Sequence, residues 1–525
     1  MTEPLGGPAL PAGIEREEAP RGLRRVGLVL GPLLFLLCLY LPGEALDAVQ
    51  RRVAAVTALT AVWWIFAVLP VGATSLLPAV LFPLLGVLGA QKVAPLYMQD
   101  LVFLFLGAFI VALGLERWNV HKRFALWTIA RIGTQPRRLV LGFMVASAFV
   151  SLWINNTSTV LLMMPIGVAV IRSVGGETRR GYDPFAVSLL LGMAYSASVG
   201  GVGTPVGTTP NQVLLGILGT MYPDAPPITF GGWMAAWLPL VVLYIPVGWI
   251  LLTRVAIRVP AGSARSIDTI ARERAALGPM GRGEKRMTAV FLTTALLWIT
   301  RGGLDLGVVR IPGWAGLVTP AGSAAPAELV TDATVATAMA VLCFLVPVDR
   351  RRGIRLMDWR TAAKMPWEVL LLIGGGFAIA GAFQSSGLDH RVGTMLAPLI
   401  EGRSEWIVVA AVVALTAALT EVTSNTATTM VLLPVLGQMA AEAGFHPLLL
   451  MAPATIAASA AFMLPVSTPP NAVVFSTRLV SVARMARVGF WFEITVGTLI
   501  VLVFQLWGRW VGGIGTEPPP WAGGG

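Results

Sequence analysis

The chain has 525 residues, of which 56% are hydrophobic and only 12% are charged. Soluble domains carry roughly a quarter of charged residues, so this chain has too few polar groups to cover a water-facing surface, and lipid must be the solvent for much of it. The formal net charge of +11 does not indicate a nucleic-acid partner, because the cations lie in short segments between apolar runs, where they orient a protein in a membrane.

The apolar runs predict an all-α polytopic membrane protein with about eleven transmembrane helices and two helical hairpins. Residues 1–26 precede the first run and are polar and rich in Pro and Gly, so we expect a disordered tail. A membrane-spanning helix needs about 20 mostly apolar residues. The segments that meet this rule are 27–46, 53–70, 74–95, 100–116, 184–206, 230–257, 287–303, 332–348, 366–385, 447–466 and 488–508.

Two further apolar stretches, 138–173 and 405–441, are interrupted in the middle by a polar cluster. Each half is therefore expected to be too short to cross a bilayer alone. We interpret the two stretches as re-entrant hairpins that enter the membrane and leave on the same side. Such backbone is tolerated only where protein or a water-filled cavity surrounds it.

The distribution of basic residues predicts the orientation in the membrane. With the N-terminus in the cytoplasm, most Arg and Lys residues fall in inner loops, and the predicted outer segments 222–230 and 304–331 contain few. Arg51 and Arg52 are the main exceptions, because this topology places them outside. We therefore expect a multi-pass protein of the cell inner membrane with an external C-terminus.

The two hairpins carry polar clusters with matching offsets. The first runs Ser151-Leu-Trp-Ile-Asn155-Asn156-Thr157-Ser158-Thr159 and is followed by Pro165; the second runs Thr420-Glu-Val-Thr-Ser424-Asn425-Thr426-Ala427-Thr428 and is followed by Pro434. A segment rich in Gly, Pro and Thr follows each hairpin, at 203–211 and at 464–471. Gly and Pro break a helix, so the sequence predicts two hairpins and two broken helices in the same order.

Five predicted spans separate the hairpins, and an odd number places the second on the opposite side of the membrane from the first. The chain is thus predicted to contain an inverted-topology repeat. Such clusters can also merely kink packed helices. Interrupted segments at corresponding positions in two halves, however, indicate the midplane binding site of a transporter.

The hairpin tips combine two kinds of backbone group. The half-helix that begins at each tip offers free N–H groups, which bind carboxylate or phosphate oxygens, and the half-helix that ends there exposes carbonyl oxygens, which suit Na⁺. Neither cluster contains Arg or Lys, and Glu421 is the one acidic residue. A dianion would therefore need bound cations to offset its desolvation. Glu421 could carry a proton or simply pair with a polar neighbour.

Other classes of membrane protein are disfavoured, and we expect that the protein is not an enzyme. The two cysteines lie in apolar runs and the three histidines are scattered, so no disulfide framework or metal cluster is indicated. The sequence has no His-Glu-x-x-His pair or paired membrane aspartates, and no histidine lies near Ser424 to activate it. A passive channel is a further alternative, but matched hairpins favour alternating access.

The four clusters resemble those of the divalent anion/Na⁺ symporter family, which comprises dicarboxylate and citrate carriers. The resemblance implies a homodimer in which a transport domain moves past a scaffold like an elevator. It implies Na⁺-coupled uptake of C4 dicarboxylates such as succinate, malate and fumarate. The alternatives on the same scaffold are a cation-independent dicarboxylate or citrate exchanger and a carrier of sulfate or another oxyanion.

The resemblance also assigns residues position by position. The implied substrate-binding residues are Asn156, Thr157, Thr208, Ser424, Asn425, Thr426, Thr468 and Pro469. One Na⁺ would lie near Ser151, Asn155, Asn156 and Gly207, and the other near Thr420, Ser424, Asn425 and Ser467. This chain has Asn155 where the family usually has Ser, and Thr209 where it usually has Pro. Asn155 could coordinate Na⁺ through its amide oxygen, or fill the site and abolish it.

The same resemblance divides the chain into two kinds of domain. Residues 27–116 and 223–365 would form the scaffold, the second segment with a basic cytoplasmic loop. Residues 117–222, with the hairpin 138–173, and residues 366–485, with the hairpin 405–441, would form the transport domain. Residues 486–525 would form the last helix and an external tail.

Overall fold

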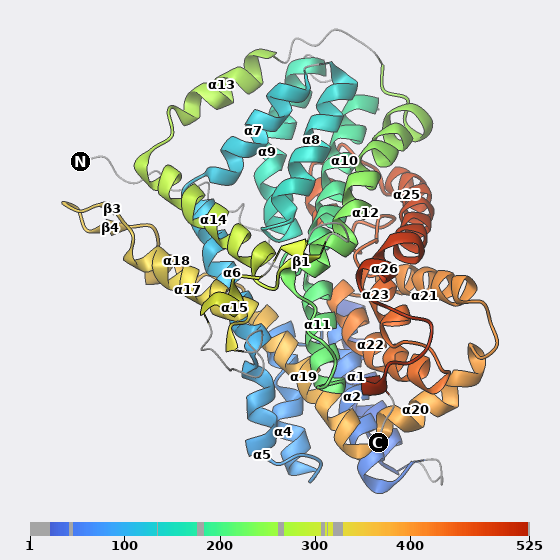
Figure 1. The fold of residues 1–525 in the computed structure, drawn as a ribbon. Coiled ribbons are helices and arrows are strands. Elements are labelled where there is room, and N and C mark those ends of the chain that lie inside the picture. The colour runs from blue at the N-terminus through green and yellow to red at the C-terminus, as the bar shows by residue number, and fades with distance from the viewer. Residues whose placement is uncertain are drawn as a thin grey trace.

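A computed structural model describes residues 21–40, 46–133, 135–175, 183–260, 267–305, 310–311, 313–318 and 329–522. Most of the predicted N-terminal tail lies outside these residues. The last part of that predicted tail is helical, because the first helix begins at Arg21. The described part of the chain is dominated by helices, with two short strand pairs, as Figure 1 shows.

The N-terminal part consists of two longer helices followed by short ones. Its elements are α1 (Arg21–Tyr40), α2 (Ala48–Ile65), α3 (Val71–Thr74), α4 (Leu77–Leu84), α5 (Ala90–Val93), a 3-10 turn (Ala94–Met98) and α6 (Asp100–Arg117). The prediction of one continuous span at 74–95 is wrong. The helix stops after Leu84, where Pro83 and the positive φ of Gly86 (68°) turn the chain.

The first repeat contains five helices. They are α7 (Val120–Ile132), α8 (Pro136–Ser151), α9 (Asn156–Gly175), α10 (Pro184–Gly200) with a 3-10 turn (Gly201–Gly203), and α11 (Thr209–Met221). Helix α10 lies against α8 and α9 and is buried along its whole length. A helix that is apolar on every side, as α10 is, belongs in the middle of a helical body.

The segment between the repeats is mainly helical and carries both strand pairs. It comprises α12 (Phe230–Ile250) with a π-helical turn (Leu251–Ala256), α13 (Ile267–Leu277), α14 (Arg282–Thr300), β1 (Leu304–Asp305), β2 (Arg310–Ile311), α15 (Ala315–Val318), α17 (Asp332–Leu345), β3 (Pro347–Asp349), β4 (Ile354–Arg355) and α18 (Trp359–Ala362). Strands β1 and β2 pair in antiparallel fashion, as do β3 and β4. Helix α17 packs against α6.

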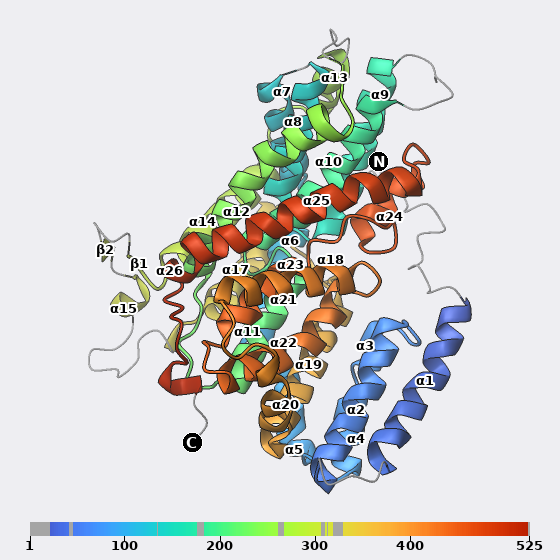
Figure 2. The same ribbon diagram turned by 90° about the vertical axis from the view of Figure 1, so that its right-hand side faces the viewer.

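The second repeat follows the order of the first. It contains α19 (Trp367–Ser386), α20 (Leu388–Leu396), a 3-10 turn (Ala397–Leu399), α21 (Glu405–Thr420), α22 (Asn425–Glu442), α23 (Leu448–Ala457) and α24 (Pro469–Ser476). The chain ends with α25 (Val482–Val503), a π-helical turn (Phe504–Gly508), α26 (Arg509–Val511) and a 3-10 turn (Pro520–Ala522). In Figure 2, α25 crosses the molecule as one long helix.

Each of the two stretches predicted to be a re-entrant hairpin forms two helices joined by a short break, and their re-entry into the membrane stays a prediction. The breaks lie at residues 152–155 and 421–424, inside the predicted polar clusters. The expectation that every half is too short to cross a bilayer is wrong for α9. That helix has 20 residues because it continues to Gly175, and a 19-residue part of it is apolar enough to span.

Among the described residues, six helices are long and apolar enough to cross a membrane: Ala90–Arg117, Asn156–Val174, Pro184–Gly203, Phe230–Ala256, Trp367–Ser386 and Val482–Val511. Four apolar helices are shorter: Val71–Leu84, Asp332–Leu345, Glu405–Thr420 and Leu448–Ala457. The predicted span 447–466 is thus wrong in extent, since its helix ends at Ala457. Short apolar helices are expected where the chain is broken inside a larger helical body.

The two repeats are interlocked rather than side by side. Helix α9 of the first hairpin packs against α24 of the second repeat, and α22 of the second hairpin packs against α11 of the first. Each hairpin therefore packs against the helix that follows the break of the other repeat. This arrangement gathers all four predicted clusters into one helical body.

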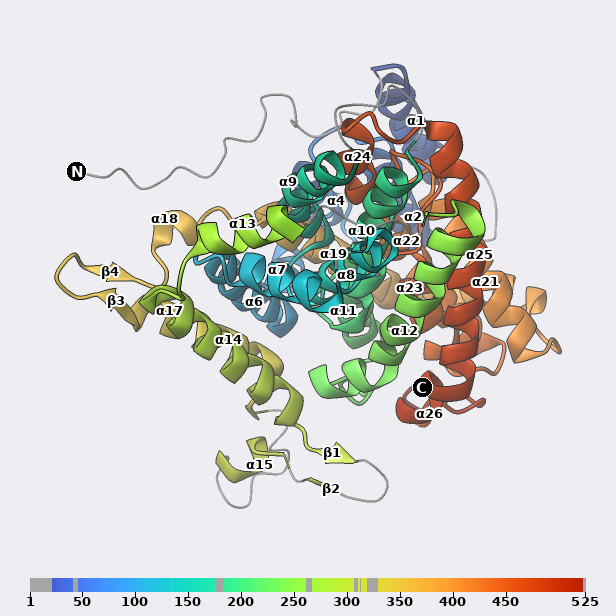
Figure 3. The same ribbon diagram turned by 90° about the horizontal axis from the view of Figure 1, so that it is seen from above.

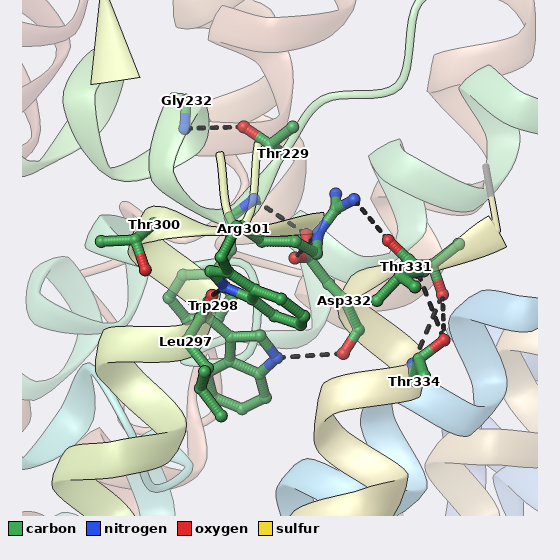
Figure 4. Close-up of polar contacts among 12 residues, drawn as sticks. Thr229, Gly232, Leu297, Trp298, Thr300, Arg301, Thr331, Asp332 and Thr334 are labelled. Carbon is green, nitrogen blue, oxygen red and sulfur yellow. Dashed lines mark hydrogen bonds and ion pairs between the residues drawn. The ribbon is translucent and has the colours of Figure 1, made fainter. Parts of the chain in front are cut away.

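A buried ion pair joins the ends of three helices in the middle segment (Figure 4). Arg301, just after α14, donates from Nε to Oδ1 of Asp332 at 2.5 Å, and Oδ2 of Asp332 accepts the backbone N–H of Phe230 at 2.9 Å. The indole of Trp298 donates to the backbone oxygen of Asp332 at 3.0 Å. The network fixes the start of α12, the end of α14 and the start of α17 relative to one another.

Candidate functional site

The first hairpin tip is shaped by the side chain of Asn155. Helix α8 ends at Ser151, and after the four-residue break Asn155 accepts the backbone N–H of Ser158 through Oδ1 at 2.8 Å. Asparagine is a favoured residue for this N-terminal capping bond. Asn155 is exposed, and its amide oxygen is already engaged at the start of α9. The amide oxygen keeps a second lone pair, so both roles of Asn155 that the sequence left open, coordination of Na⁺ or filling of the site, stay predictions.

Several oxygen atoms gather behind this first tip. The Ser151 hydroxyl donates to Oδ1 of Asn156 at 2.7 Å, and Nδ2 of Asn156 points to Oγ1 of Thr208 at 3.5 Å. A Cβ added to Gly207 would lie 2.4 Å from the backbone oxygen of Gly201 and 2.8 Å from that of Ser151. Only glycine therefore fits at position 207, where two carbonyl oxygens converge. Hydroxyl, amide and carbonyl oxygens are the ligands that hard cations prefer.

An asparagine holds the first broken helix open. The Nδ2 atom of Asn211 donates to the backbone oxygens of Thr204 at 2.7 Å and Gly201 at 3.1 Å, which helix hydrogen bonds would otherwise engage. The Thr204 hydroxyl donates to the backbone oxygen of Leu152 at 2.5 Å and so ties the break to the hairpin tip. Residues 204–208 are fully buried.

The second tip repeats the arrangement of the first. The Thr420 hydroxyl lies 2.6 Å from Oδ1 of Asn425 and 2.9 Å from the backbone oxygen of Ala458. One hydroxyl proton cannot be donated fully to two acceptors, so three oxygen atoms converge with a single proton among them. A small cation at such a place would satisfy oxygen lone pairs that hydrogen bonds leave over.

The second broken helix is also organised by an asparagine. Nδ2 of Asn471 donates to the backbone oxygens of Leu464 at 3.1 Å and Ala461 at 3.2 Å and to Oγ of Ser467 at 3.1 Å. The hydroxyl of Thr468 accepts the backbone N–H of Asn471 at 3.3 Å and caps α24. Asn211 and Asn471 hold equivalent positions, and neither was predicted from the sequence to have a role. Their shared position at the end of the two loop motifs is the sequence feature that could have indicated a common role.

Glu421 adds a feature that the first repeat lacks. Its Oε1 accepts the backbone N–H groups of Phe462 at 2.5 Å and Met463 at 2.8 Å, and its Oε2 accepts that of Leu464 at 3.1 Å. The side chain is only 3% exposed. Glu421 thus pairs with three successive amides of the second break, which is the second of the two roles that its sequence position left open. These bonds take the amides of residues 462–464 away from a continuation of the helix towards the predicted limit at 466.

Three hydroxyls at the tips are free to meet a ligand. Within the described chain, the side chains of Thr157, Ser424 and Thr426 make no hydrogen bond. Ser424 is exposed, and the other two are partly exposed at the starts of α9 and α22. Pro469 is exposed at the start of α24. The assignment of these four residues as binding residues stays a prediction.

The site contains no basic side chain. Across residues 151–159, 200–211, 420–428 and 458–471 there is no Arg, Lys or His, and Glu421, which accepts backbone amides, is the one acidic residue. Two carboxyl groups from outside these segments reach the tips: Glu116 interacts with Ser158, and Glu493 interacts with Glu421. Any attraction for an anion must therefore come from backbone N–H groups at the helix starts, from neutral side chains and from bound cations. Helix starts at Asn156 and Asn425 supply the N–H groups.

Comparisons with known proteins show which proteins this chain resembles. The family model described as "Sodium:sulfate symporter transmembrane region" matches residues 24–514. The chain is 39% identical over 490 residues to a protein of Staphylococcus saprophyticus named sodium-dependent dicarboxylate transporter SdcS, covering 91% of this chain and 90% of the relative. The protein of the same name from Staphylococcus aureus strain NCTC 8325 is also 39% identical, with the same coverage.

Two solved structures share the fold at low sequence identity. The YdaH transporter of Alcanivorax borkumensis has a TM-score of 0.53 and 17% identity, over 79% of this chain and 85% of that one. MtrF of Neisseria gonorrhoeae, described with a class of antimetabolite efflux pumps, has a TM-score of 0.57 and 12% identity, over 97% of each chain. At these identities the likeness concerns the fold alone.

Proposed function

Because the chain belongs to the sodium:sulfate symporter family, we propose that it is a secondary active transporter that carries C4 dicarboxylates such as succinate, malate and fumarate together with Na⁺. The named relatives are sodium-dependent dicarboxylate transporters, which favours this substrate class and this coupling ion. Transport in this family is not enzymatic chemistry. The observation that carries the proposal is the pair of oxygen clusters at equivalent positions in the two repeats.

The proposed cation sites use the residues around these clusters. Ser151, Asn156 and Gly207 would surround one Na⁺ together with the backbone of Asn155, and Thr420, Ser424, Asn425 and Ser467 would surround the other. The donors are neutral oxygens, the set that suits a hard monovalent ion better than a transition metal. In the described residues no group of three or more His, Cys, Asp or Glu side chains could hold a metal ion.

The proposed substrate site lies at the starts of the helices that leave each tip. The hydroxyls of Thr157 and Thr426 and the amides of Asn156 and Asn425 would bind the two carboxylates, with Thr208, Thr468 and Pro469 lining the same pocket. Without Arg or Lys, the dianion would be held by helix N-termini and by Na⁺ bound beside them. The cations would have to bind before the anion is held well, and this order couples the two fluxes.

The interlocked inverted repeats suit alternating access by an elevator mechanism. Residues 117–222 and 366–485 would move as the transport domain within a homodimer, past a scaffold formed by residues 27–116 and 223–365. Residues 486–525 would close the chain, in an inner membrane with the N-terminus in the cytoplasm and the C-terminus outside. An anion exchanger without cation coupling, for dicarboxylate, citrate, sulfate or another oxyanion, is the second candidate on the same scaffold.

Uptake of labelled succinate into proteoliposomes that contain the purified protein tests the proposal. We expect uptake that is driven by an inward Na⁺ gradient, is absent with K⁺ and is inhibited by malate and fumarate more strongly than by sulfate. Uptake that requires internal anion and ignores Na⁺ would replace the symporter with an exchanger.

Two variants link the uptake to the second tip. Asn425→Ala and Thr426→Ala should each abolish it, because each removes a polar group from the start of α22. Thr498→Ala is the matched control, since Thr498 is exposed on α25 and its hydroxyl only meets the backbone oxygen of Ile494. Unchanged uptake in the two tip variants would remove this tip from the site.

A further inference from the structure

A basic segment lies between α17 and α19, far from the proposed site. Residues 347–364, here called the basic hairpin, contain the β3–β4 pair and α18. They carry Arg350, Arg351, Arg352, Arg355, Arg360 and Lys364, against two acids, Asp349 and Asp358. Figures 1 and 3 show β3 and β4 extending away from the helical body. The segment therefore presents concentrated positive charge on a projecting element.

The two acids of the basic hairpin have structural tasks. Asp349 accepts the backbone N–H groups of Arg351 at 2.9 Å and Arg352 at 3.3 Å, so it shapes the turn. Asp358 accepts the backbone N–H of Thr361 at 2.9 Å and forms an ion pair with Arg117 of α6. Neither acid is thus available to neutralise the rest of the segment.

Five cations of the basic hairpin remain without a charged partner. The side chains of Arg350, Arg351, Arg355, Arg360 and Lys364 are exposed, and within the described chain they form no ion pair; Arg355 donates to the backbone oxygen of Phe344 at 3.0 Å. Arg352 reaches Asp349 only at 3.8 Å and is 79% exposed on its side chain. Like charges that are held close together at a turn repel one another. A polyanionic surface beside them relieves this repulsion and is therefore attracted.

The attachment of the basic hairpin keeps it near lipid. The apolar helix α17 ends at Leu345, and α19, which is long and apolar enough to cross a membrane, begins at Trp367, so apolar helices flank the segment on both sides. Trp359 is 65% exposed and Trp367 is 44% exposed. Exposed tryptophans beside the end of a span are typical of the headgroup layer of a bilayer. The exposure of Trp359 and Trp367 therefore favours a position of this segment next to the headgroup layer.

We propose that the basic hairpin binds the anionic headgroups of phospholipids in the leaflet that surrounds α17 and α19. Clusters of four to eight Lys and Arg residues next to a span are expected to attract anionic lipid. Guanidinium groups also form paired hydrogen bonds with phosphate oxygens. This binding goes beyond transport of a soluble anion and does not depend on it.

Native mass spectrometry of the purified full chain tests the proposal directly. The protein is titrated with phosphatidylglycerol or phosphatidylcholine, and the fraction of protein with bound lipid is measured. We expect preferential binding of phosphatidylglycerol, and the double variant Arg350→Gln/Arg351→Gln should bind it at least threefold less. Trp359→Ala should weaken binding of both lipids.

The matched control is Arg282→Gln/Lys285→Gln at the start of α14, which removes the same charge from two exposed residues on the same predicted face. It should bind phosphatidylglycerol like the wild type. Equal binding of both lipids by the wild type, or equal losses in the hairpin and control variants, would overturn the proposal. Displacement of the lipid by millimolar inorganic phosphate would assign the segment to a soluble phosphate ligand instead and would equally overturn it.

Discussion

Equivalent side chains do the same work at both hairpin tips. Ser151 meets Asn156 and Thr420 meets Asn425, in each case across five residues and a helix break. The spacing is set by geometry, because the hydroxyl sits on the last turn of one helix and the amide on the first turn of the next. Neutral oxygens in this arrangement can bind a cation without a carboxylate among the ligands, which would otherwise repel an incoming dianion.

Substitutions of Asn155 test which atoms form the first cation site. Because its side chain caps α9 at the exposed end of the tip, and serine caps helices about as well as asparagine, Asn155→Ser should leave Na⁺ activation of uptake unchanged within about twofold. Asn155→Ala should lower the free energy of unfolding by about 1 kcal/mol through loss of the cap. Uptake measured at graded Na⁺ concentrations checks the first expectation, and thermal unfolding checks the second. A marked rise in Na⁺ dependence with serine would mean that the native side chain obstructs the site.

A substitution of Glu421 tests whether this side chain positions the loop around the second cation site. A glutamine has one acceptor oxygen and would leave at least one of the three amides at 462–464 unpaired, which costs about 1–3 kcal/mol for a buried group. We expect Glu421→Gln to raise the Na⁺ concentration for half-maximal uptake several-fold, because Ser467 and Ala458 lie in the same loop. Glu405→Gln, at the far end of α21, is the control. Identical Na⁺ activation curves for the wild type and Glu421→Gln would refute this positioning role.

The broken helices are elements whose shape is set by side chains rather than by proline alone. Asn211 and Asn471 take up the carbonyl oxygens that each interrupted helix would use, and Glu421 takes up the amides of the second break. The buried polar backbone is thereby satisfied, as it must be in a body surrounded by lipid. This is why a chain segment without helical hydrogen bonds can persist at the centre of an apolar protein.

A substitution of Gly207 tests whether the backbone shape of the first helix break is needed for transport. A Cβ at this position would collide with the backbone oxygens of Gly201 and Ser151, and neither can move without displacing a helix end. We expect Gly207→Ala to abolish Na⁺-driven uptake while the protein still folds. Gly219→Ala on α11 is matched to it, because a Cβ there would meet nothing within 4 Å. If Gly207→Ala transported normally, the first cation site could not lie at this contact.

The sequence predicted the elements that polar clusters or long apolar runs mark clearly, and missed the elements that lack such features. Both hairpins, the first break and the spans at 100–116 and 366–385 appear where expected, since paired polar clusters or long apolar runs mark them. The helices α7, α13 and α20 were missed, because their mixed composition reads as loop. The limit of α23 was missed for a different reason: the amides of residues 462–464, which the predicted span would have included in a helix, bind Glu421, which is distant in sequence.

The candidate site was predictable in its residue types but not in its bonds. The matching offsets identified Ser151, Asn156, Thr420 and Asn425 as related residues, and the structure joins them in pairs. The capping role of Asn155 could not be inferred, because a side chain at a helix start can face either the backbone or a ligand. Tyr195 also escaped notice: its hydroxyl donates to the backbone oxygen of Phe462 at 2.8 Å, across 267 residues.

At the scale of the whole molecule, the ion pair of Arg301 and Asp332 holds the middle segment together. Breaking a buried pair by removing one partner costs about 3–5 kcal/mol, because the remaining charge is left unpaired. Arg301→Ala should therefore lower the midpoint of thermal unfolding in detergent by several degrees. The exposed pair of Arg352 and Asp349 is the comparison, and Arg352→Ala should change the midpoint little. Equal midpoints for both variants would contradict a structural role of the buried pair.

Because the two repeats pack against each other, we expect both hairpin tips to bind the same anion. Helix α9 packs on α24 and α22 packs on α11, so the two tips and the two breaks belong to one body that could bind a single anion between them. Charge-free recognition of this kind depends on both tips at once. A dianion held by only one helix start would lack half of its hydrogen-bond donors.

A structure determined by electron cryo-microscopy with succinate and Na⁺ would show whether both tips bind the anion. We predict density for one succinate between the starts of α9 and α22, in contact with Asn156 and Asn425 and with no Arg or Lys side chain at its carboxylates. Succinate bound elsewhere, or held by one tip and a basic side chain, would contradict it.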